Sequence, residues 1–248
     1  METKDAVRWF TNRPWSRAGA IATTMASAGP GRPLRLGWRV LLLISGSLLI
    51  AVAVAAMLWN SFGPGPLDVF IFGLRETTGV PLTVAYWSAF GGMVVLALLL
   101  GRRPGPGTIV TPLILGPAVE ALLAVVDQFD RPGSLVVQVI VHVAAIGLVG
   151  VGAGALIVSG LGAGTGELLA TAASDRTGRP EPHVRFGFEM GWLVVGVLLG
   201  GPIGVGTVIV AGLLGPSVAN GHRLVNGLVG PSRPDLPARV ECRVSTPV

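Results

Sequence analysis

Four long stretches of this chain contain no lysine, arginine, aspartate or glutamate. They cover residues 40–67, 77–101, 132–166 and 190–222. About 20 apolar residues are enough for one helical membrane span, and each stretch exceeds that length. Charged residues make up only 12% of the 248 residues, while hydrophobic residues make up 51%, so the chain cannot build the surface of a soluble protein. The sequence therefore predicts an all-α, polytopic membrane protein.

The chain also contains an internal repeat. Residues 63–119 align with residues 162–218 at a constant offset of 99 without a gap, and 17 of the 57 pairs are identical. Composition alone would give identity at roughly a tenth of the positions. Each half carries a Gly-rich turn, a Thr-Gly pair, a G-x-G-T turn and a Gly-Pro pair in the same order. Such self-similarity indicates two copies of one structural unit.

The apolar segments fit this repeat as about six transmembrane helices. They cover residues 40–59, 82–100, 107–126, 136–158, 184–200 and 206–222. With the amino terminus inside, 16 of the 18 basic residues are cytoplasmic and only Arg75 and Arg131 are external, as the positive-inside rule favours. A four-span alternative with re-entrant third and sixth segments places more arginines outside. Three spans per half is an odd number, so we expect two inverted three-helix repeats, as in many secondary transporters.

These segments divide the chain into four parts. Residues 1–39 are expected to form a basic, disordered cytoplasmic tail, and residues 226–248 a Pro-rich cytoplasmic tail. Residues 40–130 and 131–225 form the two membrane repeats. Both termini are therefore expected in the cytoplasm.

The repeated phrases resemble those of a known family. SFGPGPLDVFIFGLRETTG and GLGAGTGELLATAASDRTGR, followed by GPGTIVTPLILGP and GPIGVGTVIVAGLLGP, are similar to the YczE-like bacterial membrane proteins, a group related to YitT and YyaS. The resemblance covers residues 40–225 and implies an integral protein of the bacterial inner or plasma membrane. The family pattern at the Gly-rich entry reads like G-L-G-x-x-P-x-D. Asp68 matches that aspartate in the first copy, whereas the second copy has Glu167.

Few residues in or beside the predicted spans can carry chemistry. Asp68 and Glu167 each follow a Gly-rich entry, where a carboxylate either caps a helix or serves as one of two symmetric cation or proton gates. Gly116-Pro117 and Gly215-Pro216 are expected to interrupt the third and sixth spans. Such breaks either line a transport site or are ordinary packing kinks.

Four further residues carry polar groups inside or beside the spans. Glu120 lies one turn beyond Gly116, and because a carboxylate near the bilayer centre costs roughly 2.5–3.5 kcal/mol, it should face a cavity or a partner. It either couples to a substrate or proton or makes a structural hydrogen bond. Arg185 and Glu189 are four residues apart on one helix face, where they form an ion pair or line a cytoplasmic vestibule. His142 is either a hydrogen-bonded intramembrane histidine or a proton relay.

The motifs of common enzyme classes are absent from the sequence. The chain has no H-E-x-x-H, G-x-S-x-G or Walker A pattern and a single cysteine, Cys242, so we expect no enzymatic activity, cofactor or metal site. The net charge of +5 reflects membrane topology rather than nucleic-acid binding.

Three classes of function fit these observations, and each places the protein in contact with the lipid bilayer. One is a small-solute transporter or exporter. Another is a non-catalytic accessory protein that supports a membrane protein partner or an envelope process. The third is an intramembrane enzyme, for which the sequence shows none of the common motifs. A polar central cavity touching Glu120 and both Gly-Pro pairs would favour transport, and a filled apolar centre would favour the accessory role.

Overall fold

The structure is a computed structural model that describes residues 34–162 and 164–229. All regular elements in these ranges are α-helices, which confirms the predicted all-α class. The helices are α3 (Leu36–Trp59), α4 (Pro66–Thr78), α5 (Leu82–Leu99), α6 (Pro106–Val126), α7 (Leu135–Ser159), α8 (Thr165–Thr177), α9 (Glu181–Leu198) and α10 (Val205–Val229). Most of the predicted tails, 1–39 and 226–248, lies outside the described residues.

The helix boundaries repeat at the offset seen in the sequence. α8 begins and ends 99 residues after α4, and α9 begins and ends 99 residues after α5. Each half therefore contains a long helix, a helix of 13 residues and two further helices. The 13-residue helices are the Gly-entered segments between the predicted first and second spans of each half.

Local chemistry explains where several of these helices begin and end. α4 and α6 start with Pro66 and Pro106, which suit the first helical position because proline lacks the N–H that would be unpaired there. α4 and α8 end at Gly79 and Gly178, whose φ angles are 70° and 67°. A left-handed backbone at a helix end strongly favours glycine. The glycine identities between the halves therefore reflect a shared set of turns.

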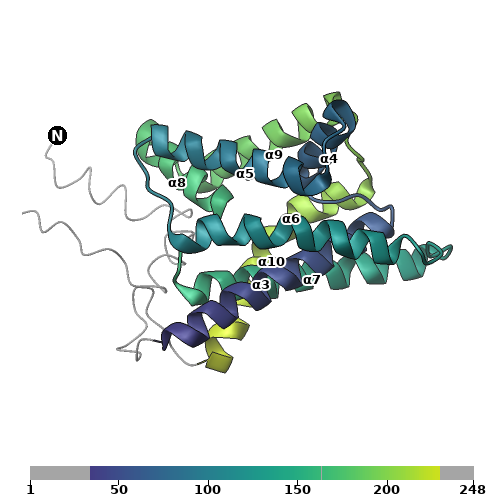
Figure 1. The fold of residues 1–248 in the computed structure, drawn as a ribbon, viewed down its shortest axis with the longest axis horizontal. Helices are drawn as coiled ribbons and strands as arrows, with labels where there is room; N and C mark the ends of the chain where they lie inside the picture. The colour runs from purple at the N-terminus through teal and green to yellow at the C-terminus, as the bar shows by residue number, and fades with distance from the viewer. Residues whose placement is uncertain (1–33, 163, 230–248) are drawn as a thin grey trace, which may run out of the picture.

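Hydrogen bonds between loops show which helix ends lie together. Arg39, near the start of α3, donates to the carbonyl oxygen of Gly160 beyond the end of α7, at 2.6 Å. Arg102, after α5, forms an ion pair with Asp175 near the end of α8. We call this the arginine-rich end of the molecule, and it lies toward the left of Figure 1.

The opposite end joins the complementary set of helix ends. Trp59 Nε1 donates to the carbonyl oxygen of Phe129 at 3.2 Å, which links the end of α3 to the loop before α7. Thr77 Oγ1 donates to the carbonyl oxygen of Leu199 at 3.0 Å, which links the ends of α4 and α9. α3 and α7 therefore run in opposite directions, and the equivalent short helices α4 and α8 finish at opposite ends (Figure 1).

Contacts between the halves come in reciprocal pairs. The N–H of Gly206 donates to the carbonyl oxygen of Phe62 at 2.7 Å, and the equivalent N–H of Gly107 donates to the equivalent carbonyl of Leu161 at 2.9 Å. In the same way α4 packs on α9 and α5 packs on α8, while α3 packs directly on its counterpart α7. Reciprocal contacts of this kind are what a twofold relation between two copies produces.

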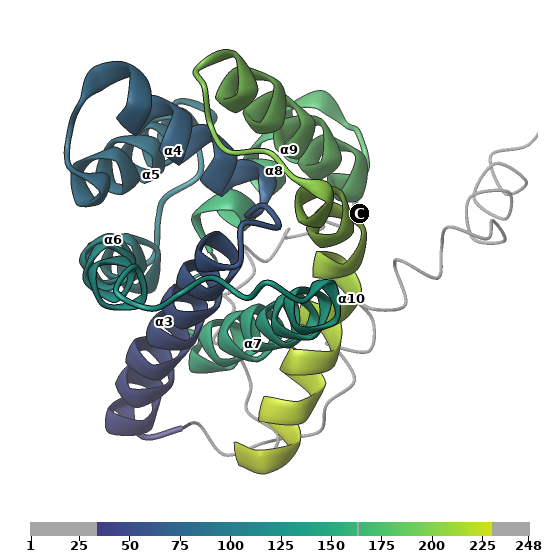
Figure 2. The same cartoon turned by 90° about the vertical axis from the view of Figure 1, so that its right-hand side faces the viewer.

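Small residues allow the central helices to approach closely. A Cβ added to Gly46 on α3 would lie 2.7 Å from the carbonyl oxygen of Gly152 on α7. A Cβ added to Gly152 would likewise lie 2.7 Å from the carbonyl oxygen of Gly46. α10 packs along α7 through Gly221, where a Cβ would collide with the carbonyl of Gly150. Close packing through small residues replaces the hydrophobic driving force that is missing between helices in a membrane. Figure 2 shows α3, α7 and α10 together on one side, below α4, α5, α8 and α9.

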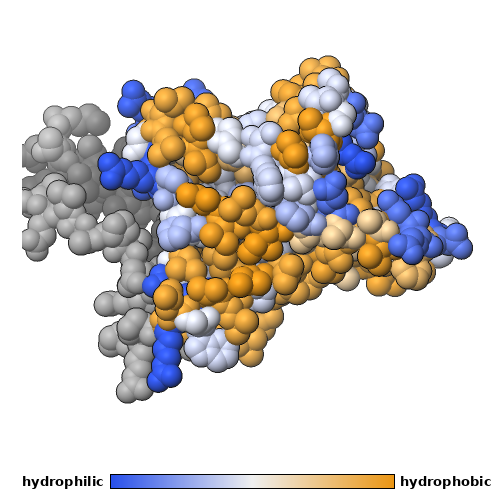
Figure 3. Space-filling view, in the orientation of Figure 1, coloured by the Kyte–Doolittle hydropathy of each residue, from blue (hydrophilic) through white to orange (hydrophobic). Residues whose placement is uncertain are grey.

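Four of the six predicted spans are confirmed as apolar helices long enough to cross a membrane. By length and composition, these are α3, α5, α6 and α7 among the described residues. The fifth and sixth predicted spans form α9 and α10, which are helical but carry more polar residues. Apolar side chains cover much of the face between the two ends in Figure 3, and hydrophilic residues gather mainly toward the ends. These features describe a multi-pass membrane protein.

The Gly-Pro pairs do not interrupt their helices, contrary to the expectation from sequence. α6 continues through Gly116-Pro117 and α10 continues through Gly215-Pro216. Each proline removes one helical N–H, and both helices nevertheless run on past it. α6 and α10 are therefore continuous helices of 21 and 25 residues.

Candidate functional site

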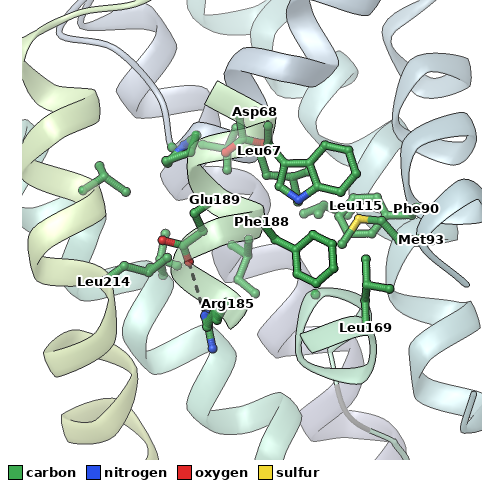
Figure 4. Close-up of a pocket in the computed structure, with 18 of the residues that line it drawn as sticks. Leu67, Asp68, Phe90, Met93, Leu115, Leu169, Arg185, Phe188, Glu189 and Leu214 are labelled. Atoms are coloured by element: carbon green, nitrogen blue, oxygen red, sulfur yellow. Dashed lines mark hydrogen bonds and ion pairs between the residues drawn. The ribbon is translucent and has the colours of Figure 1, made fainter. Parts of the chain in front are cut away.

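A cavity of about 200 Å³ lies at the centre of the molecule. Every helix from α3 to α10 contributes to its lining. An apolar cavity of roughly 150 Å³ inside a protein holds a benzene molecule, so this one is large enough for a small organic molecule. Figure 4 shows its lining from one side.

The cavity lies where the two halves meet. Five pairs of its lining residues are related by the offset of 99, namely Ile50 and Val149, Leu67 and Gly166, Phe90 and Glu189, Met93 and Trp192, and Leu115 and Leu214. Sequence reasoning singled out only Glu189 from this set. The remaining members carry no signal of their own, because apolar residues in a membrane helix face lipid as readily as they face an interior.

One wall of the cavity is charged and is formed by α9. Arg185 Nε donates to Glu189 Oε1 at 3.2 Å, and Arg185 Nη1 lies 3.5 Å from Glu167 Oε1. Arg185 and Glu189 line the cavity, and their ion pair is visible in Figure 4. The structure therefore shows the ion pair, and it places both residues at an internal cavity, while the cytoplasmic vestibule stays a prediction.

Asp68 reaches the cavity from the other half. Tyr86, which is fully buried on α5, donates its hydroxyl to Asp68 Oδ1 at 2.7 Å. Tyr86 and Arg185 are repeat partners, as are Asp68 and Glu167. In each half the acid of the short helix is therefore bound by a side chain of the following helix. The donor is a neutral phenol in the first half and a guanidinium in the second.

Aromatic and apolar side chains form much of the remaining wall. The rings of Phe188 and Trp192 stack with their centroids 6.3 Å apart. The ring centroids of Phe70 and Trp192 lie 5.0 Å apart. Phe90, whose ring stacks on Tyr86 at 6.1 Å, faces the cavity together with Met93. In Figure 4 Phe90 and Met93 lie to the right of Glu189 and Arg185, and the ring of Phe188 lies between them.

Glu120 lies outside this cavity. Its Oε2 accepts a hydrogen bond from the backbone N–H of Thr83 at 3.1 Å and another from the Thr83 hydroxyl. Thr83 is in the first turn of α5, where backbone N–H groups lack helical partners. The carboxylate of Glu120 therefore ties α6 to the start of α5, which favours the structural hydrogen bond over substrate coupling.

His142 is also separate from the cavity. It is 1% exposed, and its Nε2 lies 3.2 Å from the carbonyl oxygen of Gly206. In the other half, Leu43 occupies the equivalent position against Gly107. His142 thus fills the same packing position as a leucine and adds a hydrogen bond to the G-x-G-T turn.

The two Gly-Pro pairs have different surroundings. A Cβ on Gly116 would lie 3.1 Å from Tyr86 Cβ, so this glycine lets α6 pack against α5. Gly215 has no neighbouring atom within 4 Å of such a position. Neither pair lines the cavity, although the preceding residues Leu115 and Leu214 do.

The described part of the chain contains no cluster of three or more His, Cys, Asp or Glu side chains that could hold a metal ion. The lining of the cavity combines the charged side chains of Asp68, Arg185 and Glu189 with aromatic and apolar side chains.

Comparison with known proteins places the chain in a family. Residues 37–223 match a family of unknown function, DUF6198. The chain is 27% identical to the uncharacterized membrane protein YczE of Bacillus subtilis (strain 168) over 168 residues, which are 66% of this chain and 75% of YczE. It is 24% identical to the uncharacterized protein YyaS of the same organism over 165 residues, which are 65% of this chain and 81% of YyaS. No solved structure matches it. Since the family match runs from α3 into α10 and includes every residue that lines the cavity, the chain belongs to DUF6198, a family of YczE-like membrane proteins.

Proposed function

We propose that this protein is a small-solute transporter or exporter of the bacterial cell membrane, without enzymatic activity. The cavity touches neither Glu120 nor a Gly-Pro pair, so it is not the cavity that the sequence led us to expect. The observation that carries the proposal is instead that repeat-related residues from both halves line one central cavity. In transporters built from repeats, the solute site lies at the interface of the repeats near the middle of the membrane. A mixed lining of aromatic and charged side chains is also typical of small-molecule sites.

We further propose six spans arranged as two inverted three-helix repeats, with both termini in the cytoplasm. Support comes from the opposite directions of equivalent helices and from the reciprocal contacts between the halves. The arginines agree with this orientation. Arg39, Arg102 and Arg176, in the last turn of α8, lie toward one end. Arg75, in the last turn of α4, and Arg131 lie toward the other. The 13-residue α4 and α8 are about 20 Å long, too short to span the hydrocarbon core.

This arrangement suits alternating access to a fixed site. In inverted repeats, the two halves exchange conformations, and the shared cavity then opens toward one side of the membrane or the other. α4 and α8 end at opposite faces and each supplies residues to the cavity, so each short helix is placed to act on one side.

Blocking the cavity tests the transport function. A Cβ on Gly166 would make an ordinary contact of 3.7 Å with Met93 Cε, so Gly166→Phe can fill the cavity without a backbone collision. Gly91→Phe is the matched control, because Gly91 is exposed on α5 and has open space around it. Both variants and the native protein are purified, checked for native melting and reconstituted into liposomes.

The flux of labelled neutral, cationic and anionic small solutes is then measured. We expect protein-dependent flux of at least one class, lost in Gly166→Phe and kept in Gly91→Phe. If the folded native protein moves no solute of any class, transport is refuted and the accessory role is the function that remains. Equal flux through Gly166→Phe and Gly91→Phe would show that the solute does not pass through this cavity.

A further inference from the structure

We propose that the central cavity binds an organic monocation with an aromatic or apolar body, such as a quaternary amine. The inference rests on the proposed function in that it takes this cavity as the solute site. It goes further by assigning the sign of the charge and the shape of the solute. The charges around the cavity, its aromatic wall and its volume each contribute one part of the argument.

The balance of charge around the cavity is negative. Arg185 is the one basic side chain among the described residues that line it, whereas Asp68 and Glu189 both line it. Glu167 lies outside the lining and pairs with Arg185. With all four groups ionised, three carboxylates face one guanidinium.

The single guanidinium is already engaged by two of these carboxylates. Arg185 lies 3.2 Å from Glu189 and 3.5 Å from Glu167. An anionic solute would have to displace one of them and would also approach Asp68, whose hydrogen-bond partner is the neutral hydroxyl of Tyr86. A cation instead meets a lining whose ionised side chains sum to one negative charge, and it can approach Asp68, for which the described residues show no ion pair. Away from water such differences in charge are strong, so the sign of the solute follows from this balance.

The aromatic wall favours a cation that carries an apolar body. Phe90, Phe188 and Trp192 present rings to the cavity, and Phe188 stacks on Trp192. The faces of aromatic rings attract cations, and quaternary ammonium groups are commonly recognised by several rings together. Met93, Leu115 and Leu169 supply apolar surface for the rest of the solute (Figure 4).

The volume limits the size of the solute. At about 200 Å³ the cavity exceeds the roughly 150 Å³ that holds benzene. A single ring with a trimethylammonium group is therefore a suitable probe, and benzyltrimethylammonium has this structure. Neopentylbenzene is its neutral isostere, since a carbon atom replaces the charged nitrogen, and benzoate supplies the opposite charge.

The first test compares these three probes on the purified native protein in lipid nanodiscs. Binding is followed by quenching of tryptophan fluorescence and by calorimetry. We expect benzyltrimethylammonium to bind at least tenfold more tightly than neopentylbenzene or benzoate. Equal affinity for the cation and its isostere, or tighter binding of benzoate, would overturn the assignment of charge. This comparison requires no substitution, so it does not depend on the folding of any variant.

The second test removes the acids one at a time. Asp68→Asn and Glu189→Gln preserve shape and remove charge, and each should weaken binding of the cation at least tenfold without a similar loss for neopentylbenzene. Glu120→Gln is the matched control, because Glu120 is an acid that lies outside the cavity. This variant should bind benzyltrimethylammonium with unchanged affinity. Unchanged affinity in both cavity variants would refute the role of these acids.

The outcomes separate this inference from the proposed function. If another class of solute is transported and the cation does not bind, the charge assignment fails and transport holds. If the cation binds with the predicted selectivity and no solute crosses the membrane, the transport function fails and the cavity is a cation-binding site in a non-transporting protein.

Discussion

Equivalent residues in the two halves carry different polar groups at the cavity. Asp68 is held by Tyr86, whereas its counterpart Glu167 is paired with Arg185, the counterpart of Tyr86. A further exchange replaces Phe90 in one half by Glu189 in the other. The backbone repeats while the charges do not, so the two halves contribute different chemistry to one cavity.

The hydrogen bond between Tyr86 and Asp68 should contribute to stability. Tyr86→Phe keeps the ring that stacks on Phe90 and removes the hydroxyl that donates to Asp68. Leaving a buried acceptor unpaired costs about 1–3 kcal/mol, and we expect a loss at the lower end because Asp68 also faces the cavity. Reversible unfolding in detergent measures this change. An unchanged free energy of unfolding would show that the bond adds nothing to stability.

Glu120 should act on stability rather than on transport. Glu120→Gln retains an acceptor for the N–H of Thr83, so we expect a loss below about 1 kcal/mol and unchanged solute flux. Glu120→Leu removes the cap at the start of α5 and should cost about 1–2 kcal/mol. Thermal unfolding and liposome flux of both variants check this pair. Loss of flux in a stable Glu120→Gln protein would restore a role in coupling.

At the scale of the helices, glycine decides how closely elements pack and where they stop. Gly46 and Gly152 bring α3 and α7 together, and Gly79 and Gly178 end the short helices in left-handed conformations. The short helices α4 and α8 therefore owe their length to local backbone chemistry. Their termination leaves room for the loops that return to α5 and α9.

Two glycines on α10 allow the packing argument to be tested within one helix. A Cβ on Gly221 would collide with the backbone of α7, whereas a Cβ on Gly227 meets open space. Overpacking of a close contact costs about 1–3 kcal/mol, so Gly221→Ala should lower the free energy of unfolding by that amount. Gly227→Ala should be neutral or slightly stabilising, because alanine favours a helix more than glycine does. Similar effects of both substitutions would contradict the close approach of α7 and α10.

At the scale of the whole molecule, the loops are sorted into two ends by long-range hydrogen bonds. Arg39 and Arg102 mark one end, and the contact between Trp59 and Phe129 marks the other. Equivalent helices run between these ends in opposite directions. The same arrangement places repeat-related residues around a single cavity, which neither half encloses alone.

The proposed orientation predicts which loops a reagent can reach from outside the cell. In a Cys242→Ser background, which removes the native thiol, Gly133→Cys between α6 and α7 should react with a membrane-impermeant maleimide in intact cells. Arg103→Cys, which is exposed at the arginine-rich end, should react only after the membrane is opened. The reverse pattern would place the arginine-rich end outside, and labelling of both sites in intact cells would contradict the separation of the two ends.

The sequence alone determined the helical class, the repeat and the main turns. Hydropathy, helix length and the backbone preferences of glycine and proline are local properties, so charge-free stretches and turn motifs indicate them directly. The pairing of Arg185 with Glu189 was also predictable, because residues four apart meet on one helix face. The expected breaks at the Gly-Pro pairs were wrong, since a single missing N–H does not end a helix whose other hydrogen bonds persist.

Only the tertiary structure decided which residues line the cavity. A helix in a membrane is apolar toward lipid and toward its neighbours, so periodicity does not distinguish Phe90 or Leu115 from residues on the outer surface. The partners of Asp68 and Glu120 lie 18 and 37 residues away in the chain, on other helices. Their roles follow from how α4, α5 and α6 are placed in space, and that placement depends on contacts that no local pattern records.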